Sequence, residues 1–342
     1  MIMATRFKTA RFDDAEDVLA IDGLCINLGT AGRPRRVLDE VSLRIRRGET
    51  ACLVGESGSG KSLTSLAIMG LLPADVLRVT AGTIRLDGTE ILTRSRRQLR
   101  AMRGDRMAMI FQEPMTALNP VFTIGNQIID VLRRHKGLTR KQARSRAIDM
   151  LAEVGIPAPD KRVDEYPHQL SGGMRQRVMI AMALMCEPEL IIADEPTTAL
   201  DVTIQAQILR LLADLQREMN MAMILVTHDL GVVARIADKV VVMYAGEVVD
   251  NGSAREIFEN PRHPYTRGLL RCIPVPGKTK PGEHLGSIPG IVPSLIGKVE
   301  GCAFRSRCEV AEDACSSPVP VRRPGTDHAY RCIHDIPEGA SA

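Results

Sequence analysis

The most constraining feature of the sequence is a glycine-rich run with one lysine, Gly55-Glu56-Ser57-Gly58-Ser59-Gly60-Lys61-Ser62. It follows the apolar run 51–54, and Leu63 begins an apolar helical pattern. Glycines between a strand and a helix let backbone N–H groups wrap a phosphate, while the lysine reaches terminal phosphates and the serine ligates Mg²⁺. A chance match in this context is rare, so the run predicts an α/β fold that binds a nucleotide with Mg²⁺.

Short apolar runs alternate with helical patterns between residue 21 and about residue 252. Continuously apolar runs of this kind are typical of buried parallel strands. Four of them are Ala51–Val54, Met107–Phe111, Leu190–Ala193 and Met223–Thr227. The alternation predicts an α/β core.

Helix signals and turn signals divide the chain further. Thr139 and Gln142 have capping-box spacing, and Ser171 is a good N-cap for a helix that ends near Cys186. The stretch 113–170 is helical in pattern without a convincing buried strand, which predicts an inserted helical subdomain, and 239–249 has the pattern of a hairpin. Residues 1–20 indicate a polar leader, 21–260 the nucleotide-binding domain, and 261–342 a C-terminal arm, whose first part to about residue 300 reads as a linker or wrapped segment.

Composition excludes several classes of protein. Binding of single-stranded nucleic acid by stacking needs aromatic platforms, and the chain has Phe 6, Tyr 4 and Trp 0 with a net charge of only +4, so we expect no nucleic-acid partner. No apolar run approaches the roughly 18 residues of a membrane helix. The N-terminus lacks the apolar region of a secretory signal, so we expect a cytosolic protein with reduced thiols.

Two adjacent carboxylates, Asp194 and Glu195, follow the apolar run 190–193. Ligands bind at the carboxyl ends of strands in open α/β sheets, and a phosphate-loop hydrolase needs an acidic residue for the Mg²⁺ shell and a group that directs water. Asp194 then serves the metal, and Glu195 acts as general base. Alone, such a pair is more often a helix cap; beside the phosphate loop, the catalytic interpretation is favoured.

A second helix start suited to anions lies at Ser171-Gly172-Gly173. The body of that helix is explained by packing, but its glycines are not. One nucleotide cannot be wrapped by two distant helix starts of one subunit. We therefore expect this turn to close on the γ-phosphate held by a partner subunit.

With these motifs in order, the chain resembles the nucleotide-binding subunit of an ATP-binding-cassette (ABC) transporter over about residues 21–335. The resemblance implies a P-loop α/β domain with the helical insert, an antiparallel β subdomain and a Cys-rich C-terminal arm. It also implies catalytic roles for Lys61, Glu195 and His228. The remaining matches are Gln112 as the Q-loop, Ser171-Gly172-Gly173 as the signature, Ala199-Leu200-Asp201 as the D-loop and His228 as the switch histidine.

One departure from the family pattern concerns the adenine. The family usually has a stacking aromatic residue before the phosphate loop, whereas residues 24–36 contain none. Leu28, or one of Arg33, Arg35 and Arg36, is the alternative cover for the base.

Two segments of the arm, 261–266 and 301–308, resemble the oligopeptide and dipeptide importer branch, which includes nickel and glutathione importers. The resemblance implies an ATPase that energises import of peptides or a related small solute, bound peripherally at the cytoplasmic face of the bacterial inner membrane. The implied partners are a homologous ATPase subunit in a heterodimer, two integral-membrane permease subunits and an extracytoplasmic solute-binding protein.

Four cysteines crowd the C-terminal arm, namely Cys302, Cys308, Cys315 and Cys332. Four thiolates hold either Zn²⁺ or an iron–sulfur cluster, and zinc ribbons normally contain C-x-x-C pairs, which this arm lacks. Some relatives of the branch carry a 4Fe-4S cluster at matching cysteines, so the resemblance favours that cluster over zinc and over unligated thiols.

The principal rival function is a soluble ABC-type ATPase of DNA repair or chromosome maintenance. Such proteins insert long coiled coils or zinc modules between the motifs, and no long insertion separates Lys61 from Ser171. A translation-factor ATPase of the superfamily would carry two cassettes in one chain. A regulatory module that holds ATP without hydrolysing it is opposed by Glu195 and His228.

Overall fold

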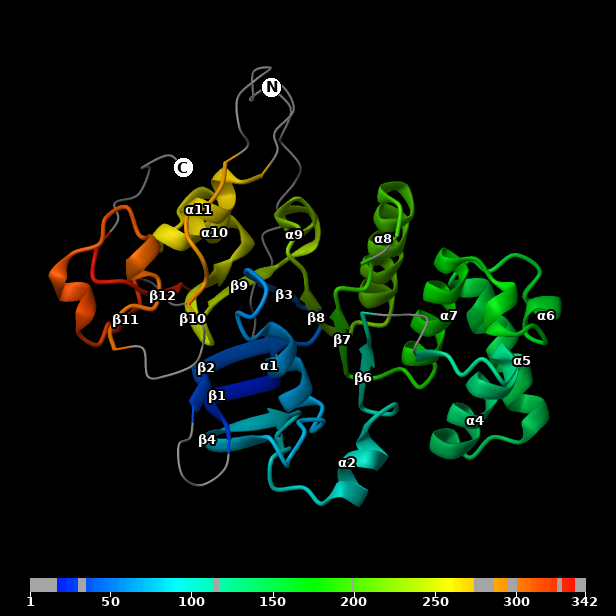
Figure 1. The fold of residues 1–342 in the computed structure, drawn as a ribbon. Coiled ribbons are helices and arrows are strands. Elements are labelled where there is room, and N and C mark those ends of the chain that lie inside the picture. Colours follow the sequence, from blue (N-terminus) through cyan, green and yellow to red (C-terminus); the bar gives the residue numbers. More distant parts are fainter. Residues whose placement is uncertain are drawn as a thin grey trace.

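The structure is a computed structural model, and it describes residues 17–29, 35–112, 117–198, 200–273, 286–293, 300–324 and 328–335. Two β-sheets lie against each other, and a group of helices stands at one side (Figure 1). No helix among these residues is both long enough and apolar enough to cross a bilayer.

The larger sheet has the order β11-β12-β10-β9-β3-β8-β7-β6. Its parallel part contains the four strands expected from the apolar runs, and β3, β7 and β8 are buried along their whole length. The antiparallel β9–β10 pair confirms the predicted hairpin. The bounds are β3 Thr50–Val54, β6 Met107–Ile110, β7 Leu190–Asp194, β8 Ala222–Val226, β9 Lys239–Tyr244, β10 Glu247–Ser253, β11 Val321–Arg322 and β12 Ala329–Arg331.

The smaller sheet is antiparallel, as expected, with the order β2-β1-β4-β5. Its strands are β1 Asp17–Leu28, β2 Arg35–Arg46, β4 Leu77–Leu86 and β5 Thr89–Glu90. Their apolar side chains share one core with α1 and the larger sheet, which we call the central sheet. Because β1 begins at Asp17 and Val18 to Ile21 are buried, the predicted end of the polar leader at residue 20 is wrong. The apolar run is short and is flanked by Asp17 and Asp22, so the sequence around it looks polar. In the structure both carboxylates bind Arg44.

The helices begin where the caps predict. Thr139 and Gln142 form the capping box of α5, and the Ser171 hydroxyl accepts a hydrogen bond from Met174 N at the start of α7. The bounds are α1 Lys61–Ile68, α2 Arg96–Met102, α4 Ile124–Lys136, α5 Arg140–Glu153, α6 Pro159–Arg162, α7 Gly172–Leu184, α8 Val202–Glu218, α9 Leu230–Ile236, α10 Ala254–Glu259 and α11 Pro264–Arg271. In the described part of 113–170 the structure is helical, as predicted, and Figure 1 places it beyond β6.

The segment after residue 260 contains more structure than a linker. Helix α11 is capped by His263, whose Nδ1 accepts a hydrogen bond from Tyr265 N, and short 3-10 helices form at Arg305–Arg307 and Asp313–Ser316. Strand β12 adds to the central sheet beside β10. Aromatic rings of Tyr244, Tyr265 and Phe304 pack together and join this segment to the cassette.

Candidate functional site

The phosphate loop connects the buried end of β3 to the start of α1. Gly55 has φ +146°, and a Cβ there would collide with the carbonyl of Met243. Gly60 has φ +105° and lies against Leu38. Only glycine combines this backbone conformation with so close an approach, so the packing of β3 against β9 fixes the loop.

Lys61 lies inside the loop. Its Nζ donates hydrogen bonds to the carbonyl oxygens of Gly55 at 2.8 Å and Glu56 at 2.9 Å. Burial lowers the pKa of this ammonium group, while the nearby carboxylates of Glu195, Asp194 and Glu56 oppose that shift. The ammonium group of Lys61 therefore lies where it would contact phosphates bound in the loop.

Ser62 and Asp194 are in contact at the C-terminal end of β7. The Ser62 hydroxyl donates to Asp194 Oδ1 at 3.2 Å. Burial raises the pKa of the Asp194 carboxyl, and the hydrogen bond from Ser62 partly offsets the shift. A hydroxyl and a carboxylate on neighbouring elements suit a hard cation such as Mg²⁺.

Glu195 contacts polar side chains that follow separate strands in the sequence. Its Oε2 accepts from Gln112 Nε2 at 3.1 Å and from Thr198 Oγ1 at 3.0 Å. Its Oε1 lies 3.6 Å from Nδ1 of His228, whose side chain is 72% exposed. Sequence reasoning missed Thr198, although its place one turn after Glu195 was a usable signal.

The Ser171-Gly172-Gly173 turn does not meet the phosphate loop of its own chain. In Figure 1, α7 and α1 stand on opposite sides of β7 and β6. The turn instead faces the start of α8: a Cβ on Gly173 would lie 3.0 Å from Ile204 Cγ2. Asp201 precedes α8 as its N-cap residue, and Ala199 lies outside the described residues.

The residues proposed to cover adenine are only partly described. Leu28 at the end of β1 packs against the core of the smaller sheet. Arg36 binds Asp39 at 2.7 Å, Arg35 is exposed, and Arg33 lies outside the described residues.

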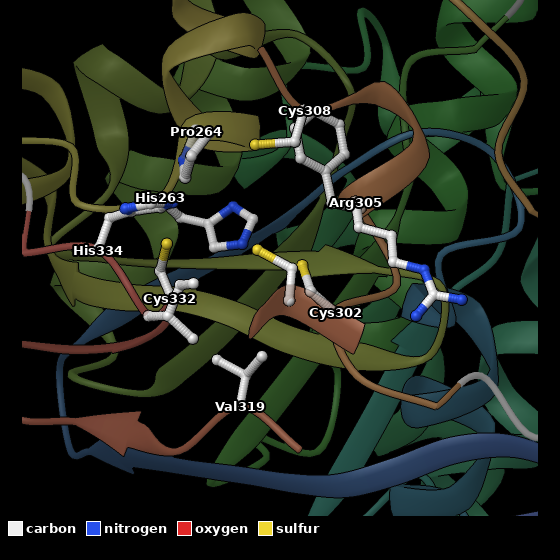
Figure 2. A pocket seen from close by; sticks show the side chains of 11 residues that line it. His263, Pro264, Cys302, Arg305, Cys308, Val319, Cys332 and His334 are labelled. Carbon is white, nitrogen blue, oxygen red and sulfur yellow. The ribbon is translucent and has the colours of Figure 1, made fainter. Parts of the chain in front are cut away.

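The four clustered cysteines line one cavity beside α11. Figure 2 shows Cys302, Cys308 and Cys332 around this space, which His263 and Phe304 also line, together with Cys315. Burial raises the pKa of the Cys302 thiol to about 11. In the described part of the chain, no three His, Cys, Asp or Glu side chains are close enough to hold a single metal ion.

Two family models match the chain. One, described as ABC transporter, matches residues 38–198, and the other, described as oligopeptide/dipeptide transporter, C-terminal region, matches residues 249–315. A putative peptide import ATP-binding protein of Brucella melitensis is 51% identical over 328 residues, covering 93% of this chain and 97% of that protein. The dipeptide transport ATP-binding protein DppD of Escherichia coli strain K12 is 50% identical over 304 residues, covering 89% of this chain and 92% of DppD.

Solved structures are similar as well. A dimeric post-hydrolysis state of the ATP-binding cassette MJ0796, bound to ADP and Pi, has a TM-score of 0.61 and 28% identity, covering 69% of this chain and 99% of that one. Part of a cbiONQ transporter complex, cbiO1 from Clostridium perfringens, has a TM-score of 0.61 and 29% identity, covering 72% of this chain and 92% of that one.

Proposed function

The chain belongs to the ABC transporter family, and on this premise we propose that it is the ATP-hydrolysing subunit that energises import of peptides or a related small solute through a partner permease. The observation that carries the proposal is the meeting of Gln112, Asp194, Glu195 and His228 at one sheet edge beside the phosphate loop. The relatives' names, peptide import and dipeptide transport ATP-binding protein, support the substrate class.

The phosphates of ATP would lie in the loop from Gly55 to Ser62. Ser62 and Asp194 would hold Mg²⁺, which neutralises charge on the phosphates. Lys61 would exchange its bonds with the Gly55 and Glu56 carbonyls for bonds to the terminal phosphates. No residue needs to move far, because Lys61 already lies inside the loop.

Glu195 would take a proton from the attacking water. Its Oε2 is fixed by Gln112 and Thr198, while Oε1 faces His228. Gln112 and Thr198 therefore orient the base, and the exposed His228 side chain is available to the γ-phosphate. General-base catalysis of this kind contributes roughly 10²–10⁴-fold to a rate.

The Ser171-Gly172-Gly173 turn completes the site of a second subunit in this proposal. A homologous chain would supply the matching turn to Lys61, so that two ATP molecules are sandwiched in a heterodimer. The dimeric MJ0796 cassette supports such an assembly. Closure would pull on two permease subunits through the helical insert and Gln112, at the cytoplasmic face of the bacterial inner membrane, with an extracytoplasmic protein delivering the solute.

We further propose a 4Fe-4S cluster in the Cys-rich arm. The four thiols that line the cavity fit the donor set of such a cluster, in which each cysteine ligates a different iron, so the sulfur atoms need not converge on one point. Its role would be structural or regulatory. Protein purified without oxygen should absorb visible light and contain iron; a colourless, iron-free sample with titratable thiols contradicts the proposal.

The transport function is tested by reconstitution. Subunits encoded beside this chain are co-expressed with it, purified together and placed in liposomes, and peptide uptake is measured with and without ATP. Uptake that requires ATP and intact Lys61 is expected, with Lys61→Ala as the inactive control. Co-purification with DNA and stimulation of hydrolysis by DNA would instead favour the rival repair ATPase.

A further inference from the structure

The C-terminal arm reaches back and holds one residue of the phosphate loop. Arg307 donates two parallel hydrogen bonds to the Glu56 carboxylate, Nη1 to Oε2 at 2.6 Å and Nη2 to Oε1 at 3.0 Å. Tyr265 OH accepts a hydrogen bond from the backbone N of Glu56 at 2.8 Å. Thus two residues from separate parts of the arm hold the loop at one position.

Arg307 is itself rigidly held. Its Nε donates to Pro289 O at 2.9 Å and its Nη2 to Ile288 O at 3.1 Å, and its guanidinium lies over the Tyr244 ring at 5.8 Å. The side chain is only 3% exposed. An ion pair with one buried partner adds little net stability because desolvation of that partner is costly, but a bidentate pair fixes geometry. Its clearest effect is therefore to orient Glu56.

These contacts fix every polar group of Glu56. Lys61 Nζ donates to its carbonyl at 2.9 Å, Tyr265 accepts from its N–H, and Arg307 binds its carboxylate. The preceding residue, Gly55, has φ +146°, and because glycine has wide backbone freedom, contacts at the next residue restrict the loop. The arm therefore adds to the packing against β9 a second restraint on the first turn of the loop, at Glu56.

We propose that Arg307 and Tyr265 are positioning residues for ATP binding: they hold Glu56 so that the loop is already shaped for a triphosphate, and neither touches the nucleotide. The inference rests on the proposed function only in requiring that this loop bind ATP. Preorganised loops bind more tightly because less ordering is needed on binding. The alternative is that the pair merely attaches the arm to the cassette.

A double-mutant cycle separates these roles. The variants Arg307→Gln, Glu56→Gln and both together are compared for the Kd of ADP with Mg²⁺ by calorimetry, for KM and kcat of ATP hydrolysis, and for the unfolding midpoint. We expect each single variant to raise Kd and KM roughly 10-fold, and the double variant to raise them no further, because both remove the same contact.

Two further variants keep the test decisive. Tyr265→Phe retains the ring packing but loses the hydroxyl, and should also raise Kd. Arg271→Gln removes an exposed ion pair of the same arm, with Glu309 at 3.2 Å, and should leave Kd unchanged. If Arg307→Gln does not fold, Arg307→Lys keeps the charge without the bidentate fork.

A lowered unfolding midpoint with unchanged Kd in the folded Arg307, Glu56 and Tyr265 variants overturns the inference and assigns the contacts to attachment of the arm. Failure of the unmodified protein to bind nucleotide, with Lys61→Ala no worse, is a different result: it refutes the proposed function itself.

Discussion

Glu195 has the left-handed backbone conformation, with φ +45°, although it is not glycine. Such a conformation typically costs about 1–3 kcal/mol and persists only where surrounding contacts hold it. Here the Glu195 N–H donates to Val226 O at 3.0 Å, and Gln112 and Thr198 bind the carboxylate. These three hydrogen bonds therefore hold both the strained backbone and the side chain that we propose as the general base.

The variant Glu195→Gln should lose ATP turnover by at least about 100-fold, because an amide of the same shape cannot accept a proton from water. Nucleotide affinity should be retained, since Glu195 makes no bond to the loop. Phosphate release and equilibrium nucleotide binding measure the two effects. Turnover close to that of the unmodified protein would remove Glu195 from the role of base.

At the residue scale, the sequence predicts side chains that belong to contiguous motifs. Lys61 and Ser62 have fixed spacing, and Asp194 directly follows a recognisable strand. The contact between Arg307 and Glu56 could not be foreseen, because it joins positions 251 residues apart. No local spacing encodes such a pair, and a lone arginine is usually a surface residue.

At the scale of elements, Asp250 of β10 joins three segments. Its carboxylate is fully buried and accepts from His263 N at 3.1 Å, Thr266 Oγ1 at 2.8 Å and His328 Nε2 at 2.8 Å. These donors belong to the start of α11 and to the residue before β12. One carboxylate therefore docks both parts of the arm onto the central sheet.

The docking of α11 should weaken in acid. Burial lowers the pKa of His263 to about 4, against an ordinary value of 6.5, although the nearby Asp250 carboxylate opposes the shift. The unfolded chain therefore binds a proton more readily than the folded one between these values. Stability is complete above pH 6.5 and falls by up to about 3 kcal/mol as the pH drops to about 4.

The measurement is urea unfolding at several pH values with the variant His263→Asn. Asparagine is a good N-cap residue, so it can still accept the hydrogen bond from Tyr265 N. The variant should lose much of the decline in stability between neutral and acid pH. An identical decline in both proteins would show that other groups cause it.

Elements were predictable where their signal was local and strong. The parallel strands were apparent as unbroken apolar runs, and α5 and α7 from their caps. Helix α11 was missed because it lies in a stretch rich in proline and glycine and is capped by a histidine, although Pro264 at its first position is a recognised start signal.

At the scale of the whole molecule, α1 and α7, whose starts we propose bind phosphate, lie on opposite sides of β6 and β7 (Figure 1). The turn at Ser171 is exposed, while α1 begins at a buried lysine. Under the proposed function, a second chain would be needed to bring both to one phosphate. The resemblance to dimeric cassettes agrees with this requirement.

Replacing Ser171 with aspartate tests that requirement. Asp and Asn both cap helices about as well as Ser, so α7 should remain intact in either variant. Ser171→Asp places a negative charge against the partner's γ-phosphate and should abolish ATP-dependent assembly and turnover, whereas Ser171→Asn should retain much of both. Light scattering with ATP measures assembly, with nucleotide affinity of the single subunit as the control.

If both variants assembled equally well, the turn would not face a phosphate. A greater loss of assembly and turnover in Ser171→Asn than in Ser171→Asp would also contradict the prediction, because only the aspartate adds a negative charge.

The distance along the chain between Glu56 and Arg307 also orders events during synthesis. The ribosome releases the phosphate loop 251 residues before its guanidinium partner. A nascent chain thus contains every nucleotide-binding motif before Arg307, which anchors the first turn of the phosphate loop through Glu56, has been synthesised. A gene fragment truncated before the arm would look intact to a motif search, yet it would encode a loop without that anchor.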